Sequence, residues 1–454
     1  MSFPDSAPLQ CHPLPFATAA QLLWAVRDAP WPVLLDSSHP ADNSGRFSIA
    51  ASAPTRTLEV HSGDAPEALE ALRLSPLTSE LPPAIQHLPF CGGWMGYWSY
   101  DAGRLFEFLP QQATDDLPLP WVRMGYYPWA LITDHLLQQT WLVGDFDSAL
   151  VTRLSKRLCT STTPPETFEL TSPFVSNLQQ ADYLQRFNQV QEWLRSGDAY
   201  QVNLAQRFTA SYQGSLYQAW QLLRADIAAP FAAFLDFGDA TLLSLSPERF
   251  LLAEADGRVE SKPIKGTRPR GSTPEQDVFF SQELLSSAKD RAENLMIVDL
   301  LRNDLGRVCE PGSIRVPELF QLESFTNVHH LVSRVTGQLA ANQQPLNLLQ
   351  ASFPGGSITG APKLRAMEII EALEPCRRSV YCGSIGYIDR RGRMDFNIAI
   401  RTFVAANNQL HVWGGGGLVA DSDGQEEYAE TLYKVARLIC CLQPDFNPTD
   451  GARC

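Results

Sequence analysis

Short apolar runs typical of strands alternate along this chain with longer segments of helical periodicity. Helical spacing predicts helices at 18–26, 181–196, 216–227, 278–305, 362–373 and 425–442. Runs rich in β-branched and aromatic residues predict strands near 33 and 47, two strands within 121–143, and strands at 200–210, 380–388, 395–405 and 409–413. Because helices are mixed with strands of the hairpin type, we expect an α+β fold with mainly antiparallel sheets.

One strand–turn–strand stretch, residues 241–271, ends close to a lysine in a distinctive position. The alternation in 241–253 predicts a half-buried strand, the sequence Ala-Asp-Gly at 255–257 predicts a turn, and the return run ends at Lys265 beside Gly266. A lysine held on a rigid strand end in dry surroundings can lose its proton and act as a nucleophile. From the spacing alone, an ordinary exposed lysine is the simpler interpretation.

Two pairs of acidic residues occupy predicted helices. Asp290 and Glu293 are three residues apart in one helix, and Glu427 and Glu430 are three apart in another, so each pair shares a helix face. Such pairs repel unless a cation lies between them, and their oxygens suit Mg²⁺. Each pair taken alone is more simply a solvated acidic face.

Other segments could bind anions or move protons. The glycine-rich run 353–363 enters a predicted helix, and residues 414–417 are four consecutive glycines, so either could present backbone N–H groups to an anion. Arg401 ends a strand and could clamp a carboxylate, although a turn or a surface cation explains these features equally well. Glu248 lies on the same hairpin as Lys265 and could donate a proton if it were desolvated. His329 and His330 are neighbours on a strand, so we expect one to be buried and the other exposed.

Composition narrows the class of protein. The chain has 454 residues with 44% hydrophobic and 19% charged residues, and its formal net charge of −14 disfavours nucleic acid as a partner. The chain contains no run of about 18 apolar residues, so no membrane span is predicted. The N-terminus does not resemble a signal peptide. Nine dispersed cysteines indicate reduced thiols, so we expect a cytoplasmic protein. A Ser-, Thr- and Pro-rich stretch at 158–180 predicts a boundary between an N-terminal subdomain, 1–175, and a second domain, 176–454.

The ordered set of segments resembles the chorismate-utilising enzymes, which include anthranilate, aminodeoxychorismate, isochorismate and salicylate synthases. The resemblance covers essentially the whole chain and is strongest from about 180 to 440. It rests on GDAYQVNLAQR (197–207), SPERF (246–250), PIKGT (263–267), DRAENLMIVDLLRND (290–304), HLVS (330–333), FPGGSITGAPK (353–363), YCGSIGY (381–387), AIRT (399–402), GGGGLVADSD (414–423) and EEYAETLYK (426–434). It implies layered, mainly antiparallel sheets flanked by helices, in two intertwined subdomains, with chorismate and Mg²⁺ bound in the catalytic domain 176–454.

The resemblance also implies roles for single residues. Glu293 and Glu430 are expected to ligate Mg²⁺ directly, with Asp290 and Glu427 acting through water. The carboxylates of the substrate are expected to meet Tyr387, Arg401, Gly416, Gly417 and Lys434. Thr267 and Thr359 are expected at the ring. His330, rather than His329, matches the active-site histidine of the family.

Two positions indicate which branch of the family the chain resembles. The branch that adds water carries a lysine where this chain has Gln201, and the ammonia-using branch carries glutamine. Anthranilate synthases have PIAGT where this chain has PIKGT with Lys265, which is the form of the aminodeoxychorismate synthases. The resemblance therefore implies an Mg²⁺-dependent transfer of ammonia to chorismate in p-aminobenzoate and folate biosynthesis. Lys265 would attack the ring, and Glu248 would protonate the leaving hydroxyl.

No Gly-x-Cys-x-Gly elbow of a glutaminase occurs in the chain, so a separate glutamine amidotransferase subunit is expected to supply ammonia. Anthranilate synthase component I is the alternative within the family, and an inactive homologue that binds a ligand is the alternative outside enzymes. The segment 34–37 also resembles the tryptophan-binding segment of anthranilate synthases. A tryptophan pocket at Asp36, Ser37 and Arg46 is therefore a hypothesis, and a plain core strand is the alternative.

Overall fold

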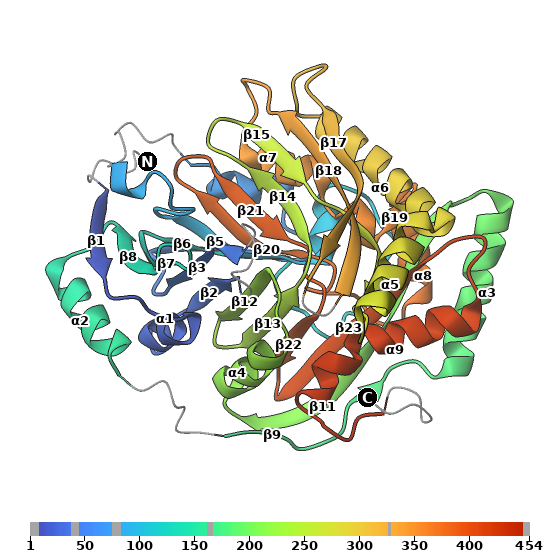
Figure 1. Cartoon of the computed structure of the whole chain (residues 1–454), viewed down its shortest axis with the longest axis horizontal. Helices are drawn as coiled ribbons and strands as arrows, with labels where there is room; N and C mark the ends of the chain where they lie inside the picture. Colours follow the sequence, from blue (N-terminus) through green and yellow to red (C-terminus); the bar gives the residue numbers. More distant parts are fainter. Residues whose placement is uncertain (1–8, 38–44, 75–82, 161–166, 326–327, 448–454) are drawn as a thin grey trace.

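The computed structural model describes residues 9–37, 45–74, 83–160, 167–325 and 328–447, which form two sheets flanked by helices (Figure 1). The α-helices are α1 (Ala19–Val26), α2 (Ser148–Leu158), α3 (Gln180–Ser196), α4 (Leu216–Asp226), α5 (Pro274–Ser286), α6 (Ala288–Gly306), α7 (Pro345–Ser352), α8 (Lys363–Leu373) and α9 (Gly424–Cys440). Short 3₁₀ segments are Pro66–Leu72, Pro83–Ile85, Tyr100–Leu105 and Gly356–Ile358.

The first half of the strands comprises β1 (Gln10–Leu14), β2 (Val33–Asp36), β3 (Phe47–Ala51), β4 (Arg56–Val60), β5 (Gly93–Trp98), β6 (Val122–Tyr127), β7 (Trp129–Asp134), β8 (Gln139–Gly144), β9 (Phe168–Leu170), β10 (Val175–Ser176) and β11 (Gln201–Gly214). The second half comprises β12 (Phe231–Asp236), β13 (Ala240–Ser246), β14 (Arg249–Ala253), β15 (Arg258–Ser261), β16 (Ile264–Pro269), β17 (Arg315–Ser324), β18 (Val328–Gln338), β19 (Gly360–Ala361), β20 (Ser384–Asp389), β21 (Met394–Asn397), β22 (Thr402–Ala406) and β23 (Gln409–Leu418).

Both sheets are antiparallel, and each takes strands from both sides of residue 175. The larger sheet runs β1-β8-β7-β3-β2-β12-β13-β22-β23-β11-β10, with β9 and β19 also paired to β11. The smaller sheet runs β16-β18-β15-β14-β21-β20-β5-β6-β4, with β17 paired to the far side of β18. The predicted α+β class and the intertwining of the N-terminal and C-terminal parts are therefore confirmed, because neither sheet is complete without both parts.

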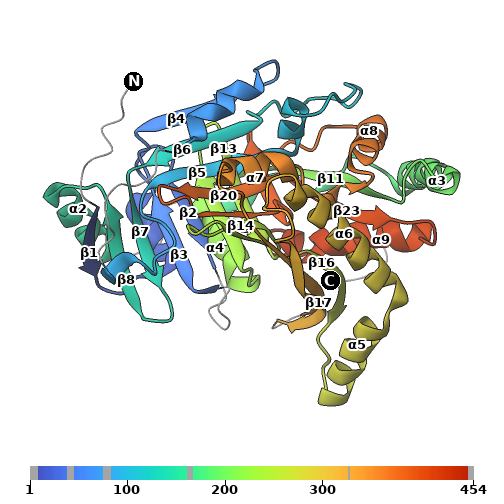
Figure 2. The same cartoon turned by 90° about the horizontal axis from the view of Figure 1, so that it is seen from above.

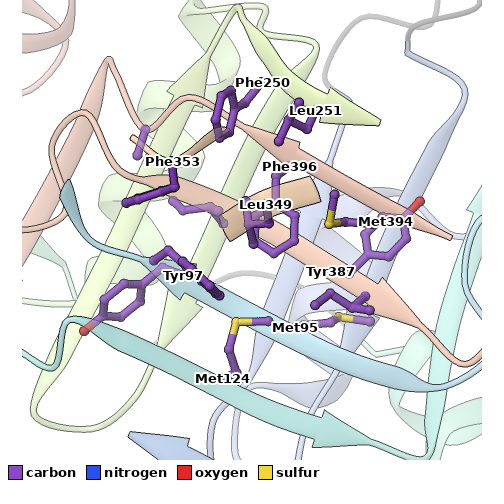
Figure 3. Packing of buried hydrophobic residues seen from close by; sticks show 14 of the residues in the cluster. Met95, Tyr97, Met124, Phe250, Leu251, Leu349, Phe353, Tyr387, Met394 and Phe396 are labelled. Atoms are coloured by element: carbon purple, nitrogen blue, oxygen red, sulfur yellow. The ribbon is translucent and has the colours of Figure 1, made fainter. Parts of the chain in front are cut away.

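The hydrophobic core joins the two parts of the chain. Met95, Tyr97 and Met124 of β5 and β6 pack in one cluster with residues of β14, β20, β21, α7 and the residue that follows α7, namely Phe250, Leu251, Leu349, Phe353, Tyr387, Met394 and Phe396 (Figure 3). Burial of each large apolar side chain contributes roughly 1.5–3 kcal/mol. This shared core makes a rigid support for whatever lies at the edges of the sheets.

The predicted strand over 241–253 is two strands that belong to different sheets. β13 pairs with β12 and β22 in the larger sheet, whereas β14 pairs with β15 and β21 in the smaller one. The break falls at Pro247 and Glu248, because proline lacks the N–H that a continuous ladder needs. Glu248 therefore lies where the chain passes from one sheet to the other.

The single helix expected over 278–305 is also divided. α5 ends at Ser286, Ser287 is extended with ψ 109°, and its side chain accepts the backbone N–H of Asp290 as the N-cap of α6. A serine that caps the following helix interrupts the preceding one, because its backbone leaves the helical region. In Figure 2, α5 projects from the body while α6 lies against it.

Smaller differences have similar causes. The region 121–143 holds β6, β7 and nearly all of β8 rather than two strands. The strand expected over 395–405 divides into β21 and β22 before Arg401, whose φ of 51° is incompatible with a strand. No described helix has both the length and the apolarity that crossing a membrane requires. Seven cysteines in the described ranges carry free thiols, and Cys440 is not one of them.

Candidate active site

Lys265 occupies an irregularity in the smaller sheet. β16 pairs with β18 at Ile264 and again at Thr267, and the register shifts between them, so Lys265 and Gly266 lie in the bulge. Gly266 has φ 83°, and a Cβ there would lie 2.8 Å from Cδ1 of Leu284 in α5 and 2.9 Å from Cγ of Asp290 in α6. Only glycine fits this position, which fixes Lys265 against both helices.

Among the described residues, no carboxylate is bonded to the Lys265 amino group. Its Nζ donates to the carbonyl oxygen of Ser357 at 3.1 Å. Burial lowers the pKa of Lys265, and Lys434 lowers it further, although Glu293, Glu248 and Glu430 act in the opposite direction. The uncharged amine is the nucleophilic form, so these surroundings favour the reactive state.

Glu248 shares Ser357 with Lys265. The Ser357 hydroxyl donates to Oε1 of Glu248 at 2.8 Å, while the Ser357 carbonyl accepts from Lys265. Glu248 is 6% exposed, and burial raises its pKa to about 7, against the lowering effects of Ser357 and Lys265. A carboxyl group with such a pKa can hold and release a proton near neutral pH.

Ser357 was not singled out from the sequence. It lies in the glycine-rich run 353–363, whose backbone N–H groups could bind an anion according to one of the two interpretations of the sequence. In the structure a carbonyl of that run accepts a hydrogen bond from Lys265. The same carbonyl accepts from Nδ2 of Asn203 at 3.2 Å, so β11 also reaches this point.

Gln201 lies beside Asn203 on the same strand, β11. Its Nε2 lies 3.5 Å from Oδ1 of Asn203, and its Oε1 is buried without a hydrogen-bond partner among the described residues. A buried acceptor without a donor costs about 1–3 kcal/mol. A Cβ at Gly417 would lie 2.2 Å from its Nε2, so the glycine leaves the space that the Gln201 side chain occupies.

The two adjacent histidines are both buried, at 2% and 3% exposure, so the expectation that one would be exposed is wrong. His329 is hydrogen-bonded to Ser324 and to Asp277 of α5, and thus holds structure together. His330 shares a hydrogen bond of 2.9 Å with the Thr267 hydroxyl. Burial lowers the pKa of His330 to about 3, with a further contribution from Arg401, so its imidazole is neutral at physiological pH.

Arg401 supplies positive charge next to His330. Its backbone adopts φ 51°, and its carbonyl accepts from Leu245 of β13. Burial lowers the pKa of Arg401, followed by repulsion from Arg437, and no carboxylate of the described chain forms an ion pair with it. A half-buried guanidinium without a carboxylate partner is suited to binding an anionic ligand.

The glycine-rich strand β23 forms the floor beneath α9. A Cβ at Gly416 would lie 2.9 Å from Oε2 of Glu427 and 3.7 Å from Oε1 of Glu430, so both carboxylates of α9 converge on this residue. Lys434 donates from Nζ to the Gly415 carbonyl at 2.9 Å and to Glu430 at 2.5 Å. The carboxylates approach the strand so closely that a Cβ would not fit, which explains why glycine occupies this position.

The four predicted metal ligands face the same region from α6 and α9. Burial raises the pKa of Glu293, and nearby Asp290 and Glu427 act in the same direction. Burial also raises the pKa of Glu427, which accepts from Ser422 at 2.6 Å and lies 3.7 Å from Lys289. Despite burial, Lys434 keeps the pKa of Glu430 below its usual value. Asp290 forms an ion pair of 3.1 Å with Arg268.

Within the described ranges, no three His, Cys, Asp or Glu side chains lie close enough together to hold a metal ion. The cationic side chains of Lys289, Lys434 and Arg268 are the present partners of these acids. The chemistry of the donor set still fits a hard divalent cation, since all the candidate ligands are carboxylates and two of them are destabilised as anions. Glu293, Glu427 and Glu430 are the residues that would hold it.

Two residues predicted to contact the substrate, Thr359 and Tyr387, have contacts within the protein. The Thr359 hydroxyl is buried and donates to the carbonyl of Gly355 in its own loop. The ring of Tyr387 packs against Phe90 and lines a cavity that does not include Lys265 among its described lining residues. The tyrosine that the structure brings to the glycine strand is Tyr381, because a Cβ at Gly415 would lie 2.9 Å from its hydroxyl oxygen.

The cavity that Tyr387 lines has a volume of about 150 Å³ and also includes Asp36, Ser37 and Arg46. The residues predicted to bind tryptophan, Asp36, Ser37 and Arg46, thus line one cavity between β2, β12 and β20. Asp36 is bonded to Arg224 at 2.6 Å and to the Ser48 hydroxyl, and Arg46 is bonded to Asp134 at 2.7 Å. These polar groups are held in place by partners outside the cavity.

The whole arrangement matches one family of proteins. The family model for chorismate binding enzymes matches residues 32–439. The chain belongs to this family. It is 47% identical over 427 residues to aminodeoxychorismate synthase component 1 of Klebsiella aerogenes and 46% identical over 427 residues to that of Escherichia coli K12, covering 91% of this chain and 94% of the relative in both cases. The crystal structure of anthranilate synthase component I from Streptococcus pneumoniae matches with a TM-score of 0.78 and 31% identity, covering 87% of this chain and 92% of that one.

Proposed function

We propose that this protein converts chorismate and ammonia into 4-amino-4-deoxychorismate and water, a step of p-aminobenzoate and folate biosynthesis. The observation that carries the proposal is the pairing of Lys265 and Glu248 through Ser357, in a member of the chorismate binding enzymes. Its relatives named aminodeoxychorismate synthase component 1 support the choice of product. Lys265 favours this reaction over that of the anthranilate synthases, in which the resemblance places alanine.

The residue chemistry supports a two-stage substitution. Neutral Lys265 forms a bond to C2 of the ring, the ring double bonds shift, and the C4 hydroxyl leaves as water with a proton from Glu248. Ammonia then bonds to C4, the double bonds shift back, and Lys265 departs as the free amine. The proton that ammonia loses returns to the Glu248 carboxylate, so the reaction releases one water per ammonia consumed.

Positive groups around the site would orient the substrate. Arg401 and Lys434 are suited to its carboxylates, and the close packing of Gly416 and Gly417 brings backbone near enough to contact them. When bound by Glu293, Glu427 and Glu430, Mg²⁺ would supply charge to hold and polarise a ring carboxylate. His330 would act as a neutral hydrogen-bonding group through Thr267 rather than as an acid, given its pKa of about 3.

The ammonia is proposed to come from a separate glutamine amidotransferase. The name component 1 of the relatives supports a second subunit, and the sequence lacks the cysteine elbow of a glutaminase. Gln201 with its unpartnered Oε1 is suited to ammonia, which can donate a hydrogen bond, and cannot usefully deprotonate water.

Mass spectrometry of the products tests the function directly. Purified protein with chorismate, Mg²⁺ and an ammonium salt should yield aminodeoxychorismate, which needs a separate lyase to release pyruvate. Fluorescent anthranilate formed without a lyase would establish the alternative activity. If chorismate remained unchanged, the result would favour the alternative of an inactive homologue that binds a ligand without catalysis.

We also propose that the cavity at Asp36, Ser37 and Arg46 binds tryptophan. Its support is the convergence of these residues on one hollow with the apolar side chains of Phe47 and Ile49. An acid, a guanidinium and apolar walls suit an aromatic amino acid. Acid denaturation of pure protein, followed by chromatography of the supernatant, should release tryptophan in stoichiometric amount, and its absence would reject this proposal.

A further inference from the structure

We propose that the ammonium group of Lys289 is an internal counter-ion of the metal site, which neutralises the acidic residues of the metal-free protein and is displaced when a divalent cation binds. The inference rests on the proposed function, in which Glu293, Glu427 and Glu430 would hold Mg²⁺. It goes beyond that function, because it assigns a role to a lysine that takes no part in the proposed chemistry and says what limits the metal affinity of this chain.

Lys289 lies among the candidate ligands. It is the second residue of α6, one residue before Asp290 and four before Glu293. Its Nζ lies 3.7 Å from Oε1 of Glu427, a side chain of α9 that is 5% exposed. In the described part of the chain, this is the one ion pair that joins α6 to α9. The lysine side chain therefore reaches from one acidic helix to the other.

The charge of Lys289 acts on three carboxylates at once. Burial raises the pKa of Glu293 and of Glu427, and Lys289 acts on each of them in the opposite direction. Despite burial, Lys434 and, to a smaller extent, Lys289 keep the pKa of Glu430 below its usual value. An opposite charge has such an effect at short range. Lys289 thus provides a positive charge that the three candidate ligands share.

A counter-ion is needed here while no metal is bound. Glu427 and Glu430 are three residues apart on α9, and both carboxylates converge on Gly416, so they repel each other. Taking ionised carboxylates out of water without a counter-ion is costly. One lysine charge offsets part of this cost, whereas a divalent ion carries twice the charge and can bind several oxygens at once. Mg²⁺ can therefore replace the ammonium of Lys289 in this role.

Among the cations beside the acids, Lys289 is the one best suited to leave. Its side chain is 52% exposed, and within the described ranges it has an ion pair but no hydrogen bond. Lys434, in contrast, also donates to the Gly415 carbonyl at 2.9 Å, and Arg268 also forms an ion pair of 2.8 Å with Glu283. A half-exposed lysine held by one loose ion pair can turn toward solvent at little cost.

The present separation of the acids agrees with this role. In the part of the chain that the structure describes, no three His, Cys, Asp or Glu side chains lie close enough together to hold a metal ion. The ammonium of Lys289 attracts Glu427 across 3.7 Å, whereas Mg²⁺ needs oxygens at about 2.1 Å. Departure of Lys289 would leave Glu427 free to approach a metal ion.

The test measures metal binding without chemistry. Isothermal titration calorimetry gives the Mg²⁺ affinity of wild type, Lys289→Met and Lys289→Arg in the absence of chorismate. Lys156→Met is the matched control, because it removes the charge of an exposed lysine on α2. Thermal unfolding of each protein with and without Mg²⁺ is a second measurement, and Lys289→Gln is a second neutral variant if Lys289→Met does not fold.

We expect Lys289→Met to bind Mg²⁺ at least about tenfold more tightly than wild type, because a repelling positive charge is removed from beside the site. Lys289→Arg keeps the charge and should stay within about threefold of wild type, and Lys156→Met should match wild type. Without Mg²⁺, Lys289→Met should melt at a lower temperature than wild type, and saturating Mg²⁺ should raise its melting temperature by more.

Three outcomes would contradict the inference. Mg²⁺ affinity in Lys289→Met that equals or falls below that of wild type would show that the ammonium does not compete with the metal. An equally large gain in Lys156→Met would assign the effect to the net charge of the whole protein. Mg²⁺ binding by neither wild type nor any Lys289 variant would contradict the metal site of the proposed function, and the inference with it.

Discussion

Two basic side chains, Arg378 and Lys265, donate hydrogen bonds to the same short loop, but they differ in how many further partners they have. On one side, Arg378 donates to Glu374 at 2.6 and 2.9 Å, to the Ile358 carbonyl at 2.9 Å and to the Asn203 carbonyl at 3.0 Å. On the other side, the Ser357 carbonyl is the one acceptor that Lys265 has within the described part of the chain. The loop 356–359 thus lies between a fully bonded ion pair and an under-bonded amine.

The difference teaches what burial does to charge. Glu374 also accepts the backbone N–H of Ala205, so nearly every polar atom of the pair is used, and attraction to Glu374 raises the pKa of Arg378 despite its burial. Lys265 and Glu248 are instead pushed toward their neutral forms by burial. Satisfied charges hold a structure together, whereas unsatisfied ones are available for reaction.

Replacing Lys265 should have the largest effect on activity. We expect Lys265→Ala to lower kcat by about 10⁴-fold through loss of the nucleophile, with partial rescue at high ammonium. The melting temperature should stay near that of wild type, because no satisfied ion pair is removed. Intact-protein mass spectrometry should lose any adduct with chorismate. A variant with near-normal kcat would show that the amine does not bond to the ring.

Replacing Arg378 should reverse that pattern. Arg378→Met leaves Glu374 buried and unpaired, so the free energy of unfolding should fall by about 3–5 kcal/mol. The double variant Arg378→Met/Glu374→Met should recover part of this loss. Urea denaturation monitored by tryptophan fluorescence measures both. A single variant as stable as wild type would remove the contrast between the two sides of the loop.

Removing the proton donor should cost less than removing the nucleophile. We expect Glu248→Gln to lower kcat by about 10²-fold. The proposed reaction requires the protonated form of Glu248, so kcat of the wild type should fall as the pH rises through its pKa of about 7. The pH profile of Glu248→Gln should lack this alkaline limb. If the limb persists in the variant, another group donates the proton.

Replacing Gln201, which is proposed to bind ammonia, should have the smallest effect. Gln201→Leu removes the unpartnered acceptor while keeping much of the volume, so the KM for ammonium should rise about tenfold with the KM for chorismate unchanged. Gln213→Leu serves as the matched control, because it replaces an exposed glutamine at the far end of the same strand, where the amide is bonded to Glu169. Steady-state kinetics with each substrate varied in turn distinguish the two. A rise in the KM for chorismate alone would place Gln201 at the ring instead.

Much of the site was predictable from residue type and order. Lys265 beside a glycine, the acid pairs at helical spacing and the glycine run 414–417 each have a local physical reason, and the family resemblance joins them. Ser357 could not be found this way, because its role depends on a carbonyl direction that nothing in the residue type encodes. The one available signal was its place within the glycine-rich run 353–363.

The misplaced elements had equally specific causes. A helix pattern over 278–305 continues through Ser287, and only the capping bond to Asp290 shows that α6 starts afresh. Tyr381 and Tyr387 both fit a strand in the same motif. The packing of Tyr387 against Phe90 directs it to the other cavity.

The sequence by itself determined the class of fold, the mainly antiparallel sheets and the set of reactive residue types, because periodicity and residue chemistry are local properties. Only the tertiary structure decided which of these residues meet. It placed the strand break at Glu248 against the bulge at Lys265, and it left one amine and one carboxyl group short of partners. Burial and partner count depend on segments more than 90 residues apart, such as Lys265 and Ser357 with a separation of 92, and no local pattern carries that information.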